Sequence, residues 1–260
     1  MSHQSPHPPR FRPVAADRPL ALWREPTGWR VTAGFLDLFA VPVQDGEPAG
    51  RRVFLARQGI GQVVLPLPLA EDWGVLACGG QDSVVCDLDA APSAEDVDGW
   101  LAILGEAVSG DGAAAAGRAL GEGHHALAEG ENSVAARQPL WVRVLSGAVL
   151  WGDDHDPVTP ETPPLPLCAG LRLNAGQPAE IVAVRSRDLM AEGNLETALA
   201  AAHHRLVAAI IRTTSHRQEM LARSIADRTR QSRRMMEAGY DTLARTITPG
   251  RPVPQPPATG

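Results

Sequence analysis

The stretch Trp29–Leu55, WRVTAGFLDLFAVPVQDGEPAGRRVFL, carries the pattern on which the fold prediction depends. Aromatic and β-branched residues gather toward both of its ends, which is typical of β-strands. Between them, the letters QDGEPAG bring together the glycines and the proline that mark a turn. The stretch therefore predicts two strands joined by an acidic turn.

A second segment of the chain repeats part of this pattern. RVTAGFLDLF (30–39) aligns with RVLSGAVLWG (143–152) at an offset of 113 residues, and Arg, Val and Gly coincide. Each segment opens a run of short strands separated by turn residues, and a repeat at a fixed offset indicates two copies of one fold. We therefore predict a mainly β protein with a long C-terminal α-helix, in which two cupin-like or jelly-roll units are joined by a helical linker.

Changes in composition divide the rest of the chain. The first residues are polar and Pro-rich and cannot form a core, whereas residues 194–247 contain no proline and place apolar residues at helical spacing. Ser93 is a good N-cap for an earlier helix. The expected segments are a disordered N-terminal arm (1–21), a first β-roll (22–92), a helical linker (93–136), a second β-roll unit (137–190), a long amphipathic helix (194–247) and a Pro-rich linker or tail (248–260).

The composition argues against several classes of function. A formal net charge of −6 over 260 residues does not suit a general binder of polyanions, and nucleic acid is not expected as a partner. The chain contains no lysine, so it has no Walker-type phosphate loop, and it has no Gly-x-Ser-x-Gly elbow. We therefore predict a protein that is not an enzyme and has no catalytic residue and no cofactor.

Cysteine and histidine give no reason to predict a metal site. Cys78, Cys86 and Cys168 lack the close pairing of metal ligands and are expected to be free thiols in a reducing compartment. The neighbouring pairs His124–His125 and His203–His204 point in different directions on a helix, so we expect solvated surface histidines. The chain also lacks a long apolar span and a signal sequence, which indicates a cytoplasmic location.

A ligand site can be proposed on the turn of the opening stretch. Glu47, Arg51 and Arg52 resemble the Gly-Glu…Arg arrangement by which cyclic-nucleotide domains hold ribose and phosphate. The arginines follow the glutamate too closely for that arrangement, and a simple turn with an ordered arginine is the alternative.

A second candidate site lies on the predicted C-terminal helix. Its basic residues could contact acidic lipids or the acidic face of a partner, and the alternative is a solvated helix face. The residues predicted for partner or membrane contact are Arg223, Arg228, Arg230, Arg233 and Arg234.

The chain resembles the N-terminal region of ATP-binding exporters that serve bacteriocins with nitrile-hydratase-type leader peptides. The resemblance extends over about residues 25–248. This chain contains neither the membrane spans nor the ATP-binding loop of that family. It implies a cytosolic β-roll region at the inner face of the cell membrane, with leader peptide, exporter subunits or the membrane domain as partners. The residues that carry it are Val31, Gly34, Asp37, Phe39, Ala40, Gly50, Arg52 and Gly61.

These observations leave three hypotheses open. The leading one is a non-catalytic docking module of a peptide exporter. The first alternative is a sensor of a small molecule similar to a cyclic nucleotide. The second is a structural oligomerisation module, such as a homodimer formed through the C-terminal helix.

Overall fold

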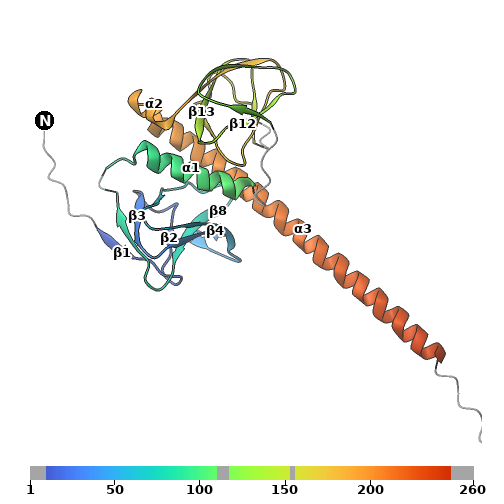
Figure 1. Ribbon diagram of the computed structural model, residues 1–260. Coiled ribbons are helices and arrows are strands. Elements are labelled where there is room, and N and C mark those ends of the chain that lie inside the picture. Colours follow the sequence, from blue (N-terminus) through green and yellow to red (C-terminus); the bar gives the residue numbers. More distant parts are fainter. Residues whose placement is uncertain (1–9, 89, 110–116, 153–155, 247–260) are drawn as a thin grey trace, which may run out of the picture. The chain divides into compact units, whose positions relative to one another are not determined.

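The computed structural model describes residues 10–88, 90–109, 117–152 and 156–246 (Figure 1). Its contacts divide the chain into two units, Met1–Thr214 and Ser215–Gly260, which are considered separately below. The described residues are mostly β-sheet, followed by a long C-terminal helix, as the sequence predicts. The predicted Pro-rich tail and residues 1–9 of the predicted arm lie outside the described residues.

The first roll consists of two facing sheets. One sheet has the strand order β1-β9-β3-β7, and the other has the order β2-β8-β4, with β5 and β6 both paired to β4. All of the pairs are antiparallel. The strands are β1 (Phe11–Pro13), β2 (Leu20–Ala21), β3 (Trp29–Ala33), β4 (Leu36–Gln44), β5 (Glu47–Pro48), β6 (Val53–Gln58), β7 (Val63–Val64), β8 (Trp73–Gly79) and β9 (Val84–Asp87).

The second roll has the same strand order as the first. Its sheet β11-β17-β13-β15 corresponds to β1-β9-β3-β7, and β12-β16-β14 corresponds to β2-β8-β4, with β10 added beside β12. The strands are β10 (Arg118–Leu120), β11 (Gly123–Leu127), β12 (Asn132–Ala135), β13 (Leu140–Ser146), β14 (Leu150–Trp151), β15 (Leu165–Leu167), β16 (Leu173–Asn174) and β17 (Ala179–Val184).

The repeat extends to irregular details of the backbone. The register of β3 shifts between Val31 and Ala33, and that of β13 shifts between Val144 and Ser146. Each bulge is followed by a glycine with positive φ, Gly34 at 68° and Gly147 at 75°. Both features recur at the offset of 113 residues that the sequence shows.

Two expected boundaries differ from the structure. Strands β10, β11 and β12 lie within residues 93–136, which we expected to be a helical linker, and β1 and β2 lie within the arm expected to be disordered. The reason is the same in both places. Each strand has little β-forming sequence of its own but pairs with a distant partner: β11 with β17, β1 with β9 and β2 with β8.

Helix α1 (Ala94–Ser109) follows the first roll. Its N-terminus is closed by a capping box, because the Ser93 hydroxyl accepts a hydrogen bond from the Asp96 amide and the Asp96 carboxylate accepts one from the Ser93 amide. The helix packs against β6 and β7 of the first roll and against α2. Its buried face belongs to a core that continues through both rolls, with the side chains Val97, Trp100, Leu101 and Leu104.

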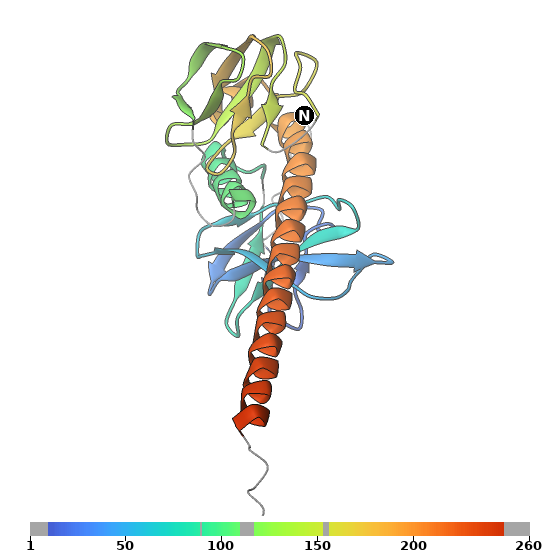
Figure 2. The same cartoon turned by 90° about the vertical axis from the view of Figure 1, so that its right-hand side faces the viewer.

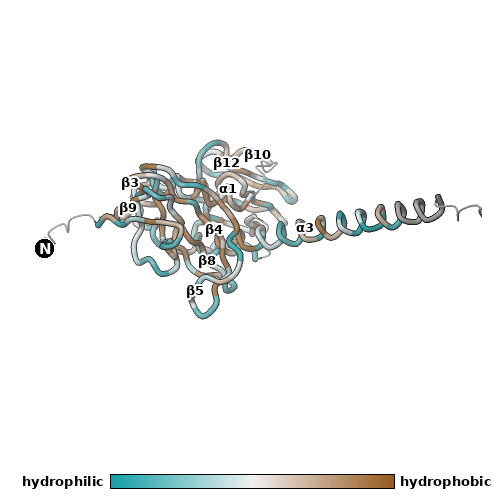
Figure 3. Tube along the Cα trace, turned by 90° about the horizontal axis from the view of Figure 1, so that it is seen from below, coloured by the Kyte–Doolittle hydropathy of each residue, from teal (hydrophilic) through white to brown (hydrophobic). Residues whose placement is uncertain are grey.

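Helices α2 (Ser186–Ala191) and α3 (Leu195–Thr246) follow the second roll. The first part of α3 lies beside α1 (Figure 2) and contributes buried residues up to Thr214. From residue 222 to residue 237, every side chain of α3 is exposed, and hydrophilic and hydrophobic residues alternate along the helix (Figure 3). Within the described residues, no helix has the length and apolar character needed to cross a membrane.

Candidate functional site

The structure gives each of the three predicted ligand residues a different environment. The exposed Glu47 carboxylate accepts a hydrogen bond from Arg24 at 2.7 Å. Arg52 donates to the carbonyl of Ala16 at 3.3 Å and contacts the sulfur of Cys78 at 3.4 Å, whereas Arg51 is exposed between β5 and β6. Among the described residues, no hydrogen bond or ion pair joins Glu47 to either arginine. The structure therefore does not bring this trio together as a site.

One of the histidines expected on the surface is buried. His203 of α3 is 7% exposed, and its Nε2 accepts a hydrogen bond from the indole Nε1–H of Trp100 at 3.0 Å. Burial, assisted by the neighbouring His204, lowers the pKa of His203 to about 4. The expectation of a solvated side chain was wrong because this face of α3 packs against α1, which the sequence does not reveal. His203 is therefore a neutral structural residue near pH 7.

Two of the three thiols lie in surroundings that make them poor nucleophiles. Cys78, Cys86 and Cys168 are free. Burial raises the pKa of Cys168 to about 12, and it also raises the pKa of Cys78 despite the nearby Arg52. In the described part of the chain, no three His, Cys, Asp or Glu side chains are grouped as metal ligands.

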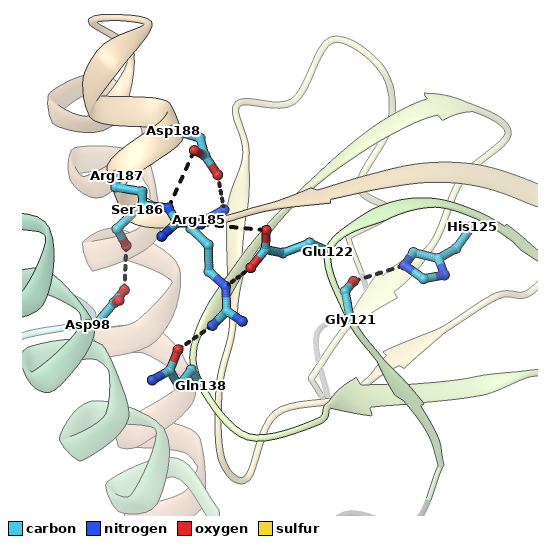
Figure 4. Close-up of polar contacts among 9 residues, drawn as sticks. All are labelled: Asp98, Gly121, Glu122, His125, Gln138, Arg185, Ser186, Arg187 and Asp188. Atoms are coloured by element: carbon cyan, nitrogen blue, oxygen red, sulfur yellow. Dashed lines mark hydrogen bonds and ion pairs between the residues drawn. The ribbon is translucent and has the colours of Figure 1, made fainter.

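A polar network links the second roll to α1 and α2. The buried indole of Trp141 donates to the Ser186 hydroxyl at 2.7 Å, and that hydroxyl donates to the Asp98 carboxylate at 2.5 Å (Figure 4). Half-burial raises the pKa of Asp98, although Ser186 and Arg185 partly offset this effect. The arrangement is not a catalytic triad, because Ser186 is fully buried and its hydrogen already binds the carboxylate.

Arg185 extends this network on the exposed side. Its guanidinium binds the carboxylate of Glu122 at 2.5 Å and the side-chain carbonyl of Gln138 at 2.6 Å, while its backbone amide donates to Asp188. Figure 4 places the ring of His125 apart from these groups, where it contacts the carbonyl of Gly121. Because Arg185 pairs with Glu122 and the Ser186 hydroxyl binds Asp98, we regard the network as a structural joint.

An open polar site lies beside this joint, at the start of α3. A cavity of about 240 Å³ is lined by Arg143 of β13, Thr162 and the first residues of α3. Its other lining residues are Pro160, Pro164, Asn194, Thr197 and Ala198. The first amides of an α-helix have no partner within the helix and carry partial positive charge. Arginine, hydroxyl groups and helix amides together form surroundings that suit an anion.

A carboxylate of the chain already reaches the edge of this cavity. One oxygen of Glu192 accepts hydrogen bonds from Arg143 at 3.0 Å and from Asn194 at 3.1 Å. The hydrogen bonds from Arg143 and then Asn194 lower the pKa of Glu192. Arg143 and Asn194 therefore bind a carboxylate in this structure, which shows that the geometry of the site suits an anionic oxygen.

Sequence reasoning did not select Arg143 as a site residue. The cavity combines a strand, a Pro-rich connection and a helix start that are far apart in the sequence. One signal was present, because Arg143 occupies the position of Arg30 in the aligned repeat. An arginine that recurs at a position flanked by buried residues indicates a role outside the core.

The five predicted contact arginines of α3 are all exposed. Three of them form ion pairs along the helix: Arg223 with Glu219, Arg230 with Asp227, and Arg233 with Glu237. Pairs of this kind support a helix weakly and are screened by salt. They reduce the positive charge that the helix can offer a partner, without removing it.

No protein-family model and no curated protein matches this chain. Among solved structures, it is similar to the regulatory subunit of a cAMP-independent protein kinase A from Trypanosoma cruzi bound to guanosine. The identity is 10%, the match covers 72% of this chain and 74% of the other, and the TM-score is 0.20.

A second solved structure has a likeness of the same strength. It is the regulatory domain of protein kinase A from Toxoplasma gondii with cAMP, at 12% identity, 82% and 86% coverage and a TM-score of 0.21. Both neighbours are regulatory regions of a kinase. Scores this low add nothing to the assignment of a site.

Proposed function

We propose that this chain is a non-catalytic regulatory module whose second roll binds a small anion in the Arg143 cavity. The observation that supports the proposal is the convergence of the Arg143 guanidinium, the Thr162 hydroxyl and the start of α3 on one cavity. The buried Ser186 and the thiols of Cys78 and Cys168, whose pKa values are raised by burial, are poor nucleophiles, which favours a binding role over catalysis.

The size of the cavity limits the ligand. Sites for drug-sized molecules usually measure about 300–1,000 Å³. A cavity of about 240 Å³ is smaller. It suits a phosphate group or a small carboxylic acid better than a whole nucleotide. The proposal therefore keeps the sensor hypothesis but moves its site from Glu47, Arg51 and Arg52 to Arg143, and it narrows the ligand to the anionic group.

The position of Glu192 suggests how binding could be transmitted. An incoming anion competes with Glu192 for Arg143 and Asn194, which both bind that carboxylate. Glu192 lies between α2 and α3, next to Gly193, whose φ is 74°. Displacement of the carboxylate would therefore act on the junction between the two helices, and α2 is joined to α1 through Ser186 and Asp98.

The test is a thermal-shift titration of the full chain at constant ionic strength. Inorganic phosphate, a small dicarboxylate, cAMP and cGMP serve as ligands, and chloride serves as the control for salt. We expect phosphate to raise the melting temperature, because a ligand that binds only the folded state stabilises it. A response to the cyclic nucleotides alone would locate recognition outside this cavity and contradict the proposal.

Two matched variants assign the response to a site. Arg143→Gln should abolish the shift, whereas Arg30→Gln removes the equivalent arginine of the first roll and should keep it. Arg30→Gln is expected to lower the basal stability by less than about 1 kcal/mol, because its ion pair is partly exposed. An equal ligand response in both variants would show that the anion binds elsewhere.

A docking role within a peptide exporter is the second candidate function. The observation that favours it is the run of exposed side chains from residue 222 to residue 237, which includes all five predicted contact arginines. A pull-down with the cognate leader peptide and the exporter membrane domain tests this setting. Capture of neither one would leave the exporter hypothesis without support.

A further inference from the structure

The second part of α3 presents one continuous helix face, which we call the stripe. It consists of Arg217, Ile225, Arg228, Ser232 and Met236. Residues eleven apart in an α-helix return to the same face after three turns, so Ile225 and Met236 continue the line of Thr214. Thr214 is buried, whereas Ile225 and Met236 are 56% and 60% exposed. Ile225 and Met236 therefore form an exposed apolar line along this face.

The stripe differs from the rest of the helix in its charges. Between residues 215 and 237, the chain has six arginines and three carboxylates. All three carboxylates lie off the stripe, in the ion pairs with Arg223, Arg230 and Arg233. The stripe itself contains two arginines and no acidic residue.

Arg217 shows that the stripe lacks an acceptor. Its Nη2 is buried and has no hydrogen-bond partner among the described residues. Leaving a buried donor without a partner is unfavourable, and more so when the group is charged. Within the described residues, Arg228 also forms no ion pair. Arg228 is exposed and is therefore placed to receive a carboxylate from another molecule, whereas the buried Nη2 of Arg217 is not accessible to one.

We propose that the stripe docks an amphipathic helix of another protein that carries acidic residues beside its apolar face. The eleven-residue spacing suits a helix that runs alongside α3, since an apolar line that follows the helix can be matched over several turns. A carboxylate on that partner would pair with the exposed Arg228. This inference deepens the docking candidate and does not depend on anion binding at Arg143.

The same observations disfavour two other occupants. The same helix segment of a second copy, residues 215–237, brings six arginines against three carboxylates and supplies no acidic residue from its own stripe. A bilayer surface is bound by helices with bulky apolar residues, often aromatic, and residues 215–237 contain no Phe, Trp or Tyr. Ser232 also interrupts the apolar line that a membrane would cover.

The experiment uses the full chain and a labelled synthetic helix. The probe peptide repeats apolar residues at the 4-4-3 spacing of the stripe and places glutamates to face Arg228, while a matched peptide carries lysines instead. Fluorescence anisotropy should show binding of the acidic peptide and at least about tenfold weaker binding of the lysine peptide, because opposite charges at an interface set specificity. No binding of the acidic peptide would overturn the proposal.

Two charge reversals on α3 test the face. Arg228→Glu lies on the stripe. It should weaken binding of the acidic peptide at least about tenfold and strengthen binding of the lysine peptide. Arg223→Glu makes the same change off the stripe and should alter either affinity by less than about threefold. Circular dichroism confirms that both variants keep their helix content. Equal effects of the two reversals would overturn the proposal, because peptide binding would then not depend on which face of α3 carries the changed charge.

The remaining outcomes separate the other occupants. Binding to phosphatidylserine vesicles in preference to the acidic peptide would replace the proposal with membrane contact. A dimer in analytical ultracentrifugation that Arg228→Glu dissociates would replace it with self-association. The phosphate response of Arg228→Glu is measured as well. If that response persists while peptide binding fails, only the docking inference is wrong.

Discussion

Each roll has an arginine at the same position of the repeat, but the two arginines make different contacts. Arg30 of the first roll and Arg143 of the second occupy equivalent strands, and each lies between buried neighbours, so each guanidinium points away from its core. Arg30 binds both oxygens of Asp96 in α1, at 3.0 and 2.9 Å, and also the carbonyl of Gly61. Arg143 makes a single hydrogen bond to Glu192 and lines a cavity.

The difference follows from the helix that comes after each roll. Asp96 is held by the capping box of α1, so the first arginine meets a fixed two-oxygen partner. Although partial burial alone would raise the pKa of Asp96, hydrogen bonds from Arg30 and Ser93 lower it. Glu192 ends the short helix α2 instead, and the cavity opens beside it. The comparison teaches that equivalent arginines of a repeat can differ in their contacts: one binds both oxygens of a carboxylate, and the other makes a single contact beside an open cavity.

The largest expected effect tests whether the rolls are true equivalents. Gly34→Ala and Gly147→Ala each place a Cβ at positive φ, with Ser83 Oγ at 2.6 Å in the first roll and the Pro178 carbonyl at 2.5 Å in the second. Backbone strain of about 1–2 kcal/mol and overlap of about 1–3 kcal/mol should together lower the free energy of unfolding by about 2–5 kcal/mol. Urea denaturation measures the loss in each variant.

A third glycine separates the cost of backbone strain at positive φ from the cost of steric overlap of the added Cβ. Gly130 also has positive φ, at 78°, but a Cβ there would meet no atom within 4 Å. Gly130→Ala should therefore cost only the backbone strain of about 1–2 kcal/mol. A large loss in one bulge variant with full tolerance in the other would contradict the equivalence of the two bulges.

Much of the fold could be predicted because local sequence and final structure agree. The strand-rich segments after Trp29 and after Leu140 carry β-branched and aromatic residues, and the helix predicted over 194–247 forms over Leu195–Thr246. The prediction failed where strands depend on distant partners. The segment Gly123–Leu127 has two adjacent histidines and weak β-propensity, and its strand exists through its pairing with β17.

The candidate site was harder to predict for a related reason. Arg143, Thr162 and Asn194 meet only after the chain has folded, and none belongs to a motif of fixed spacing. The one usable signal was the repeated arginine, because Arg30 and Arg143 align at the offset of 113 residues. The aligned letters show that the position recurs, but they do not show that its partner changes from Asp96 to Glu192.

The next expected effect concerns the contact between the helices that follow the two rolls. Trp100 of α1 donates to neutral His203 of α3, whose pKa is lowered to about 4 by burial. An unfolded histidine titrates near 6.5, so the unfolded state binds more protons than the folded state between these values. The contribution of His203 to the free energy of unfolding should be fully present above about pH 6.5. It should decrease by about 3 kcal/mol as the pH falls toward 4.

Two glutamine variants separate this effect from the general loss of stability in acid. His203→Gln keeps an acceptor for Trp100 but cannot take up a proton, so its stability should depend less on pH than that of the parent chain. His204→Gln changes the exposed neighbour and should leave the pH dependence largely intact. Urea midpoints between pH 7.5 and pH 4.5 give the three curves. Identical slopes for His203→Gln and the parent would exclude His203 as the acid-sensitive contact.

The smallest expected effect asks whether α1 belongs to both rolls. A Cβ on Gly105 would overlap the carbonyl of Ala169 and lie 2.6 Å from the sulfur of Cys168, both in the second roll, whereas a Cβ on Gly99 of the same helix would meet nothing within 4 Å. Alanine normally favours a helix over glycine by about 0.5–1 kcal/mol. Gly99→Ala should therefore stabilise the protein by about that amount, while Gly105→Ala should destabilise it by about 1–3 kcal/mol because the close approach is lost. If α1 supports the second roll directly, urea denaturation should show changes of opposite sign in the free energy of unfolding of the two variants. Stabilisation by both substitutions would mean that α1 serves the first roll alone, and the two rolls would then have to be compared as independent units.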